Sequence, residues 1–434
     1  MCLCLHSNNG VKIECSLTVI SNQGKIILEN KEMFMLYDFE YYTPTKVVFG
    51  DGAEKNVGKL IKEQNAKKVL IHYGSNFAVK SGLIDRVKET LRESQIEFVE
   101  LGGVVPNPRL SLVREGIKLG RSEKVDFILA VGGGSTIDSS KAIGFGLADE
   151  EGKDVWDFYE KKRTVKDCIP VGVILTIAAA GSEMSSGSVI TNEDGFWKKS
   201  AGSQKARPKF AIMNPKLTTS LPKYQTMSGC VDIMMHTLER YFTKAGASMM
   251  VTDQIAEGIL RTVKANALIL NRDPENYEAR ANVMWASSLS HNDLTNCGNS
   301  SRGDWASHNM EHEIGGLFDV AHGAGLSALW ATWARYVYKE NSARFAQLGY
   351  SVFSLPSSGD FEKDALTAID AMEDFFSSIS MPINLKQLGV FPTESQMKEM
   401  ASKATNGNKN NTIGDMKKLD EKDLYNIYKL ALGE

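Results

Sequence analysis

The 434-residue sequence has few of the features that mark membrane, nucleic-acid-binding or disulfide-stabilised proteins. Its net charge is −3, so no basic field is present to hold nucleic acid or an anionic membrane. No apolar run approaches the roughly 18–20 residues of a membrane span. The six cysteines are few and irregularly spaced, which argues against a disulfide framework and favours a reducing cytoplasm. We expect a cytoplasmic globular protein with room for two domains.

Residues 1–34 differ from the rest of the chain. They lack the positive start, long apolar stretch and small-residue cleavage site of a secretory signal. Cys2, Cys4 and Cys15 have no second Cys/His pair that would complete a zinc site. We expect an N-terminal extension that takes no part in the chemistry.

Apolar strand-like runs alternate with amphipathic helical stretches between residues 65 and 180. Strands are expected at 67–73, 96–101, 126–131 and 168–177, and helices at 83–93 and 110–121. Short connections between alternating elements predict βαβ units and a parallel sheet covered by helices.

After about residue 222 the helical spacing dominates, for example over 227–242, 250–269 and 361–377. The sequence therefore predicts an α/β fold in which an N-terminal Rossmann-like parallel-sheet domain (35–220) precedes an all-α C-terminal domain (221–434).

A glycine-rich turn lies directly after the strand expected at 126–131. It reads Gly132-Gly133-Gly134-Ser135, and glycines let the backbone approach a phosphate closely. We expect Ser135 to cap the following helix, whose free N–H groups favour an anion. The pattern is neither G-x-G-x-x-G nor a P-loop. Asp138 and Lys141 fall on the next helical turns, within reach of a bound ribose or nicotinamide.

Histidines concentrate in the helical half beside acidic residues. Asp232 and His236 are four apart in an apolar helix, which places both on one face. His308 and His312 repeat that spacing on a helix that we expect to end at Gly315-Gly316, and His322 follows. One Asp and up to four His offer the oxygen and nitrogen ligands that Fe²⁺ or Zn²⁺ accepts. The alternative is a set of hydrogen-bonded core histidines.

The order of these motifs resembles the iron-containing (group III) alcohol dehydrogenase family, and within it the NADPH-dependent butanol dehydrogenase and aldehyde reductase branch. The resemblance runs from about Tyr37 to the C-terminus. The motifs that carry it are Pro44-Thr45-Lys46-Val47-Val48-Phe49-Gly50, Pro106-Asn107-Pro108, Gly132-Gly133-Gly134-Ser135 with Asp138 and Lys141, Gly181-Ser182-Glu183, Gly229-Cys230-Val231-Asp232 with His236, and His308-x3-His312-x9-His322-Gly323.

The resemblance implies a role for each matching residue. It implies metal ligands at Asp232, His236, His308 and His322. It implies catalytic roles for His312, near the nicotinamide, and for Asp138, beside the nicotinamide ribose, and either His312 or a ribose-linked water chain would move the proton. It implies cofactor contacts at Gly74, Ser75, Asn107, Gly133, Gly134, Ser135, Asp138 and Lys198.

Three positions at which the chain differs from relatives bear on the cofactor. Ser75 stands where NAD-preferring relatives carry an Asp, so NADP(H) is favoured over NAD(H). Bulky Phe77, however, interrupts a stretch that is glycine-rich in the branch. Ala180 also replaces a Thr that relatives often place close to the cofactor.

The resulting hypothesis is a metal-dependent alcohol dehydrogenase or aldehyde reductase. It would transfer hydride reversibly between NAD(P)H and short aliphatic aldehydes or primary alcohols such as butanal and butanol. Trp305 and Phe318 either shape an apolar substrate pocket or belong to the core. Alternatives are a polyol (glycerol-type) dehydrogenase, a dehydroquinate-synthase-like lyase of the same architecture, and a non-catalytic nucleotide- or metal-binding protein. The resemblance also implies a homodimer.

Overall fold

The computed structural model describes residues 37–74, 76–408 and 410–433, together with the backbone of four short strands within the first 36 residues. Those strands form two antiparallel pairs, β1 (Leu3–Ser7) with β2 (Gly10–Glu14) and β3 (Thr18–Ile20) with β4 (Ile26–Leu28). The other residues of the expected extension lie outside the described part. No helix among the described residues is long and apolar enough to cross a membrane.

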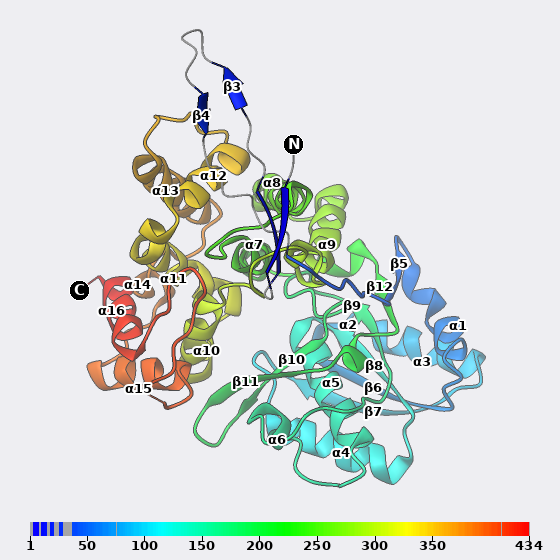
Figure 1. Ribbon diagram of the computed structural model, residues 1–434. Helices are drawn as coiled ribbons and strands as arrows, with labels where there is room; N and C mark the ends of the chain where they lie inside the picture. The colour runs from blue at the N-terminus through cyan, green and yellow to red at the C-terminus, as the bar shows by residue number, and fades with distance from the viewer. Residues whose placement is uncertain are drawn as a thin grey trace.

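A six-stranded parallel sheet forms the first half of the described chain (Figure 1). Its order is β5-β12-β9-β8-β6-β7. The strands are β5 (Lys46–Phe49), β6 (Lys68–Gly74), β7 (Glu97–Val104), β8 (Phe127–Gly132), β9 (Val171–Leu175) and β12 (Phe210–Met213). Strands β8 and β9 are buried along their whole length, as continuous apolar runs predict for a covered parallel sheet.

Alternate residues of each strand enter different cores, because successive side chains point to opposite faces. Leu129 and Val131 pack in the core that contains α1 and α3, whereas Ile128 and Ala130 pack in the core that contains α4 and α5. The helices of this half are α1 (Val57–Lys62), α2 (Asn76–Lys80), α3 (Leu83–Glu93), α4 (Leu110–Glu123), α5 (Gly134–Ala148) and α6 (Trp156–Tyr159).

The strand order reverses between β6 and β8. The chain leaves β6 towards β7 on one side and returns to β8 on the other. In open parallel sheets, ligands bind in the crevice outside the carboxyl ends of the strands at such a reversal. The residues that follow these two strands therefore mark the expected cofactor crevice.

An antiparallel hairpin that the sequence did not predict extends from this half. It consists of β10 (Gly187–Asn192) and β11 (Trp197–Gly202), and β11 packs against α10 of the second half. Edge strand β5 and strand β12 were also missed, because both are only four residues long.

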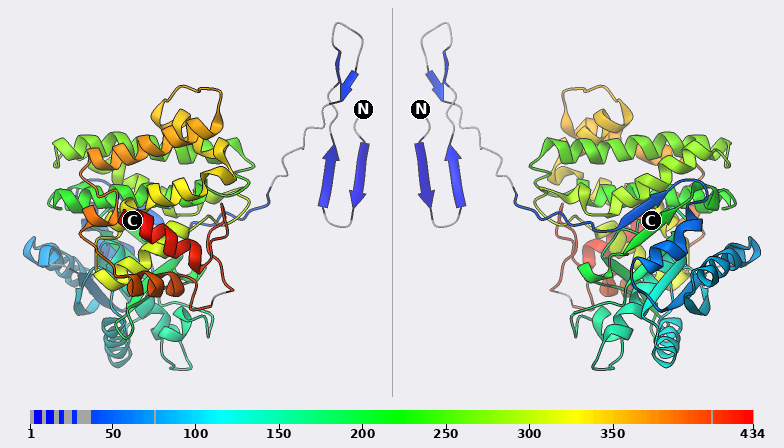
Figure 2. Two further views of the ribbon diagram at one scale, coloured as in Figure 1. Left: turned by 90° about the vertical axis from the view of Figure 1, so that its left-hand side faces the viewer. Right: turned by 90° about the vertical axis from the view of Figure 1, so that its right-hand side faces the viewer.

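The second half is a helical assembly that lies above the sheet half in both side views (Figure 2). Its helices are α7 (Lys223–Tyr241), α8 (Met250–Arg272), α9 (Tyr277–His291), α10 (Ala306–Phe318), α11 (His322–Val337), α12 (Ser342–Phe353), α13 (Phe361–Ser378), α14 (Leu385–Leu388), α15 (Glu394–Ala404) and α16 (Glu421–Leu432). The predicted fold class is confirmed. The boundary predicted at 220/221 falls between β12 and α7, and the division into domains remains a prediction.

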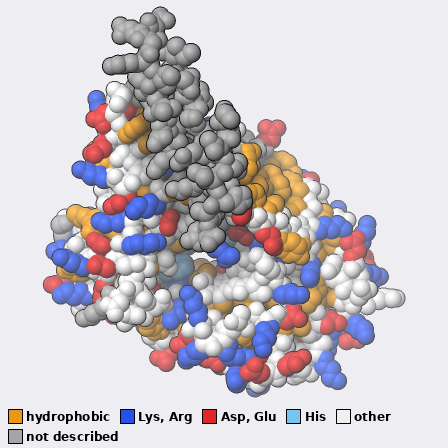
Figure 3. Space-filling view, in the orientation of Figure 1, with side chains coloured by type: hydrophobic (Ala, Val, Ile, Leu, Met, Phe, Trp, Pro, Cys, Tyr) orange, Lys and Arg blue, Asp and Glu red, His pale blue; other side chains and the backbone are white. Residues whose placement is uncertain are grey.

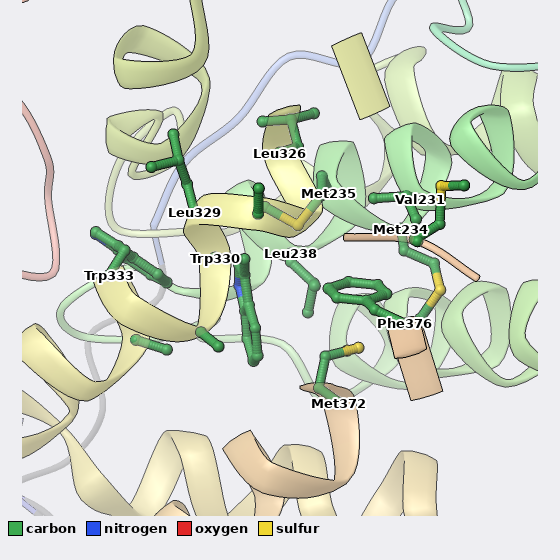
Figure 4. Close-up of a cluster of buried hydrophobic side chains, with 14 of the residues drawn as sticks. Val231, Met234, Met235, Leu238, Leu326, Leu329, Trp330, Trp333, Met372 and Phe376 are labelled. Atoms are coloured by element: carbon green, nitrogen blue, oxygen red, sulfur yellow. The ribbon is translucent and has the colours of Figure 1, made fainter. Parts of the chain in front are cut away.

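Helices α7 and α11 pack through large apolar side chains. Met235 and Leu238 of α7 meet Leu326 and Trp330 of α11, with α13 beneath (Figure 4). This core packs the two helices together, so that the candidate ligands in the middle of α7 lie next to His322 at the start of α11. The expectation that Gly315-Gly316 ends its helix is wrong, since α10 continues to Phe318.

Candidate metal centre and cofactor site

Asp232 and His236 lie one turn apart in the middle of α7, and both are almost completely buried. Nδ1 of His236 donates to the backbone carbonyl of Asp232 at 3.0 Å and lies equally close to its Oδ1. With Nδ1 carrying the proton, Nε2 of His236 presents its lone pair as a metal ligand.

Two further histidines converge on the same carboxylate from different helices. Nε2 of His308, in α10, lies 4.0 Å from Oδ1 of Asp232, and Nε2 of His322 lies 3.8 Å from it. His322 is the first residue of α11 and is followed by Gly323. A Cβ at Gly323 would lie 1.9 Å from the Ser228 carbonyl, so this glycine lets α11 begin directly against α7.

The atoms that face one another at this point fit a divalent cation. Oδ1 of Asp232 and Nε2 of His308 are buried and accept no hydrogen bond from any described residue. A buried carboxylate oxygen left in this way is costly unless a cation satisfies it. Burial raises the pKa of Asp232, but the facing imidazoles of His236 and His322 outweigh burial and hold it well below its usual range. Three nitrogens and one oxygen suit Fe²⁺ or Zn²⁺.

Glu239, which the sequence analysis missed, fixes the ring of His308. Its Oε1 accepts from Nδ1 of His308 at 2.8 Å and from the His308 backbone N–H at 3.1 Å. Its Oε2 accepts from the Trp305 backbone N–H at 2.6 Å. Burial raises the pKa of Glu239 to about 7. Carboxylates that hold the outer nitrogen of a ligand histidine fix its tautomer and orientation.

Glu311, also missed, does the same for His322. Its Oε2 accepts from Nδ1 of His322 and from the ammonium of Lys198, 3.2 Å away. Both glutamates come three residues after a candidate ligand, His236 and His308 respectively. That spacing places them on the ligand's face of the helix, and it could have identified them.

His312 lies at the rim of the centre, with its ring 5.8 Å from that of His322. Burial lowers the pKa of His312 well below its usual value, with the charge of Lys198 acting in the same direction. The ligand atoms of Glu311, His312 and His322 also lie within 4.8 Å of one another and could in principle hold a metal. The Lys198 ammonium beside Glu311 repels a cation there, which favours the cluster around Asp232.

His291, a third residue that sequence reasoning did not single out, closes the other side of the centre. Its ring meets that of His236 edge to face, with centroids 4.1 Å apart, and burial lowers its pKa well below the usual value. Trp305 packs against His236 and His308. On the face shown in Figure 3, histidine surface is visible at the hollow between the two halves.

The glycines at the carboxyl ends of β6 and β8 are required by close packing. A Cβ at Gly74 would lie 2.8 Å from the Val104 carbonyl, and one at Gly133 would lie 2.8 Å from Cβ of Ile177. The expectation that Ser135 caps α5 is wrong, because Gly133 occupies the cap position and no side chain caps the helix. Gly134 and Ser135 lie in the first turn, whose backbone N–H groups suit an anion. Ser75 lies outside the described residues.

The remaining predicted cofactor residues differ in whether their polar atoms already have hydrogen-bond partners within the chain. Oδ2 of Asp138 accepts from the Val189 N–H at 2.9 Å, while its buried Oδ1 has no partner among the described residues. Burial raises the pKa of Asp138. The Asn107 amide donates to Oδ1 of Asp319 at 2.9 Å. The Lys141 ammonium donates to the backbone carbonyls of Ser182 and Ser185, in the loop after β9, and of Gly187, the first residue of β10. Burial lowers its pKa to about 8. These bonds leave Lys141 with no free donor for a cofactor.

An open parallel sheet with a crevice at its carboxyl edge, together with a histidine–carboxylate cluster, is typical of enzymes that use a nucleotide cofactor and a metal ion. Residues 44–215 match the family model described as iron-containing alcohol dehydrogenase, and residues 226–432 match the model of that family's C-terminal part. The chain belongs to the iron-containing alcohol dehydrogenase family.

Individual relatives agree with this assignment. The chain is 39% identical over 398 residues to the probable NADH-dependent butanol dehydrogenase 1 of Bacillus subtilis, covering 92% of this chain and 100% of that protein. It is 35% identical over 358 residues to the NADPH-dependent aldehyde reductase YqhD of Escherichia coli, covering 81% and 89%. The structure of NADH-dependent butanol dehydrogenase A from Thermotoga maritima superposes with a TM-score of 0.87 at 36% identity, covering 91% and 99%.

Proposed function

We propose that this chain is a metal-dependent aldehyde reductase and alcohol dehydrogenase that transfers hydride reversibly between NAD(P)H and short aliphatic aldehydes or primary alcohols. The observation that carries the proposal is the pair of unpartnered, buried ligand atoms, Oδ1 of Asp232 and Nε2 of His308, beside the crevice of the sheet. Relatives named as butanol dehydrogenases and as an aldehyde reductase support butanal and butanol as representative substrates.

Four side chains would hold the metal, namely Asp232, His236, His308 and His322. The metal supplies polarisation of a carbonyl oxygen, and the nicotinamide supplies or accepts hydride. Glu239 and Glu311 keep two of the ligand rings oriented through their Nδ1 atoms. Reduction adds a hydride to the carbonyl carbon and a proton to its oxygen. We assign the transfer of that proton either to His312 at the rim of the centre, whose neutral ring can take up a proton at one nitrogen while it donates one from the other, or to a water chain linked to the nicotinamide ribose.

The cofactor would lie across the carboxyl ends of β6 and β8. Gly133, Gly134 and Ser135 would bind the pyrophosphate at the start of α5, with the help of Gly74 at the end of β6 and of Ser75, the next residue in the sequence. The unpartnered Oδ1 of Asp138 would accept a hydroxyl of the nicotinamide ribose. Asn107 and Lys198 would reach the cofactor only by exchanging partners that they already have, so we assign them a secondary role.

The choice between NADPH and NADH depends on Ser75. A neutral hydroxyl at this position accommodates a 2′-phosphate, whereas an Asp would repel it. We therefore retain the prediction that NADPH is preferred. Relatives point both ways, since those at 39% and 37% identity are named for NADH and the one at 35% for NADPH. Iron is the metal for which the family is named, and the same ligands also suit Zn²⁺.

Association and location are also part of the proposal. We propose a homodimer, which size-exclusion chromatography with light scattering would test. A cytoplasmic location is supported by cysteine usage, since Cys168, Cys230 and Cys297 are free thiols.

Anaerobic purification with metal analysis, beside initial rates for NADPH and NADH against C2–C6 aldehydes, tests the function. We expect about one metal per chain and saturable oxidation of the cofactor with butanal. Metal-loaded protein without turnover would favour a binding protein. A preference for glycerol-type diols would favour a polyol dehydrogenase, and a centre without His308 would favour the lyase alternative.

A further inference from the structure

Lys198 belongs to the sheet half by sequence but contacts the helical half. It lies on β11, and its ammonium is 3.2 Å from Oε2 of Glu311 on α10. The side chains of Lys198 and Glu311 are 6% and 0% exposed. A buried ion pair of this kind is strongly sensitive to the loss of either partner, because the remaining charge is left without compensation.

The hairpin is held so that Lys198 has little freedom to move. Successive strand residues point to opposite faces, and the neighbouring Lys199 ammonium lies 4.5 Å from the centre of the Trp197 ring. The Lys403 ammonium donates to the Gly195 carbonyl at 2.9 Å, which ties the hairpin turn to α15.

Glu311 is equally constrained from the helical side. A Cβ at Gly315 or at Gly325 would lie 2.9 Å from Oε1 of Glu311. Two glycines on neighbouring helices thus form a notch that fits this carboxylate and fixes its direction. The same Oε2 that meets Lys198 accepts from Nδ1 of His322, whose Nε2 faces Asp232.

We propose that Lys198 is a positioning residue for the metal ligand His322 and acts through Glu311. The hairpin β10–β11 of the sheet half then takes part in setting the geometry of the metal centre in the helical half. The proposal rests on the metal site assigned under the proposed function. It gives Lys198 a task that does not require contact with the cofactor.

Metal affinity of the purified chain provides a readout separate from activity. We would strip the metal, titrate Zn²⁺ against a chromophoric chelator, and record the visible spectrum with Co²⁺, which reports ligand geometry. Loss of an outer partner of a metal ligand typically weakens metal binding by about 10–100-fold, and we expect that for Glu311→Gln. For Lys198→Met we expect metal affinity to fall by about tenfold, the low end of that range, and the Co²⁺ spectrum to change.

The double variant is the decisive member of the series. If Lys198 acts through Glu311, Lys198→Met has little further effect in the Glu311→Gln background. Lys198→Arg keeps the cation and is expected to restore most of the affinity, and Lys198→Gln serves should the Met variant not fold. Lys199→Met is the matched control, since it removes the adjacent charge on the opposite face, and it should bind metal as the unaltered chain does.

Two outcomes would overturn the inference alone. One is unchanged metal affinity in Lys198→Met with only a higher KM for the cofactor, and the other is strict additivity in the double variant. Failure of the proposed function is recognised separately: the unaltered chain would then bind no metal, or bind it equally well with Asp232→Ala.

Discussion

The metal centre and the carboxyl end of the sheet differ in how their polar groups are arranged. At the centre, Nδ1 of His236, His308 and His322 each has a fixed acceptor, whereas the facing atoms Oδ1 of Asp232 and Nε2 of His308 have no partner among the described residues. At the sheet, the start of α5 offers backbone N–H groups and no capping side chain. The proposed centre therefore suits a small ion held by converging side chains, whereas the proposed crevice suits a longer ligand bound through backbone groups.

The comparison also separates residues with a buried, unpartnered polar atom that could bind a ligand from residues whose polar atoms are bonded within the fold. Asp138 keeps a buried, unpartnered oxygen, as Asp232 does. Lys141 and Asn107 have satisfied partners within the chain. Buried polar atoms are normally hydrogen-bonded. The exceptions at Asp138 and Asp232 support a ligand because they coincide with other candidate site residues, whereas Nε1 of Trp330, also unpartnered among the described residues, lies in the apolar core.

Removing the carboxylate at the centre should have the largest effect. Asp232→Ala deletes the only oxygen ligand of the proposed set and leaves three facing imidazoles. Turnover should fall by about 10³-fold, because metal polarisation is worth several kcal/mol and each 1.36 kcal/mol is tenfold. Metal analysis beside initial rates measures this. Retained metal with normal turnover would place the chemistry elsewhere.

Removing a residue that orients a metal ligand should have a smaller effect than removing the ligand itself. Glu239→Gln removes the charge that holds Nδ1 of His308 and weakens the acceptor for two backbone N–H groups. We expect metal affinity to fall by about 10–100-fold, measured by chelator competition. Glu257→Gln is the control, since Glu257 is buried in α8 and accepts from the Tyr241 hydroxyl outside the centre. Equal metal affinity in both variants would show that Glu239 does not support the metal centre.

At the crevice, Gly133→Ala should act on the cofactor and spare the metal. The new Cβ would lie 2.8 Å from Cβ of Ile177, and overpacking of this kind costs about 1–3 kcal/mol. A shift of the turn worth 1.4 kcal/mol raises the KM for the cofactor about tenfold. Gly187→Ala is the control, because its Cβ would meet no atom within 4 Å. Loss of metal from Gly133→Ala would show that the two regions are not separable in this way.

The smallest expected effect concerns cofactor choice. Ser75→Asp should lower kcat/KM for NADPH relative to NADH by about three- to tenfold, because like charges are pushed together. Rates with both cofactors, beside a Ser81→Asp control in the turn between α2 and α3, measure the ratio. An unchanged ratio would mean that Ser75 does not face the 2′-position.

How much the sequence could predict differs between the two regions. The cluster of candidate ligand histidines could be predicted because histidine is rare in the chain and the order His308, His312, His322 resembles the family's pattern, and the choice of ligands among them stays a prediction. The pairing of Lys198 with Glu311 was not, since it joins residues 113 positions apart through tertiary packing. The cap at Ser135 was placed wrongly because a glycine run does not show where the helix begins. The hairpin β10–β11 was missed because its strands carry charged and small residues and lack a clear apolar alternation.

The most direct test is a crystal structure of the chain reconstituted with Zn²⁺, with anomalous scattering recorded at the zinc edge. The account predicts one ion bound by Oδ1 of Asp232 and by Nε2 of His236, His308 and His322, with Glu239 and Glu311 still on the outer nitrogens. An ion held by Glu311, His312 and His322, or no ion beside Asp232, would contradict it.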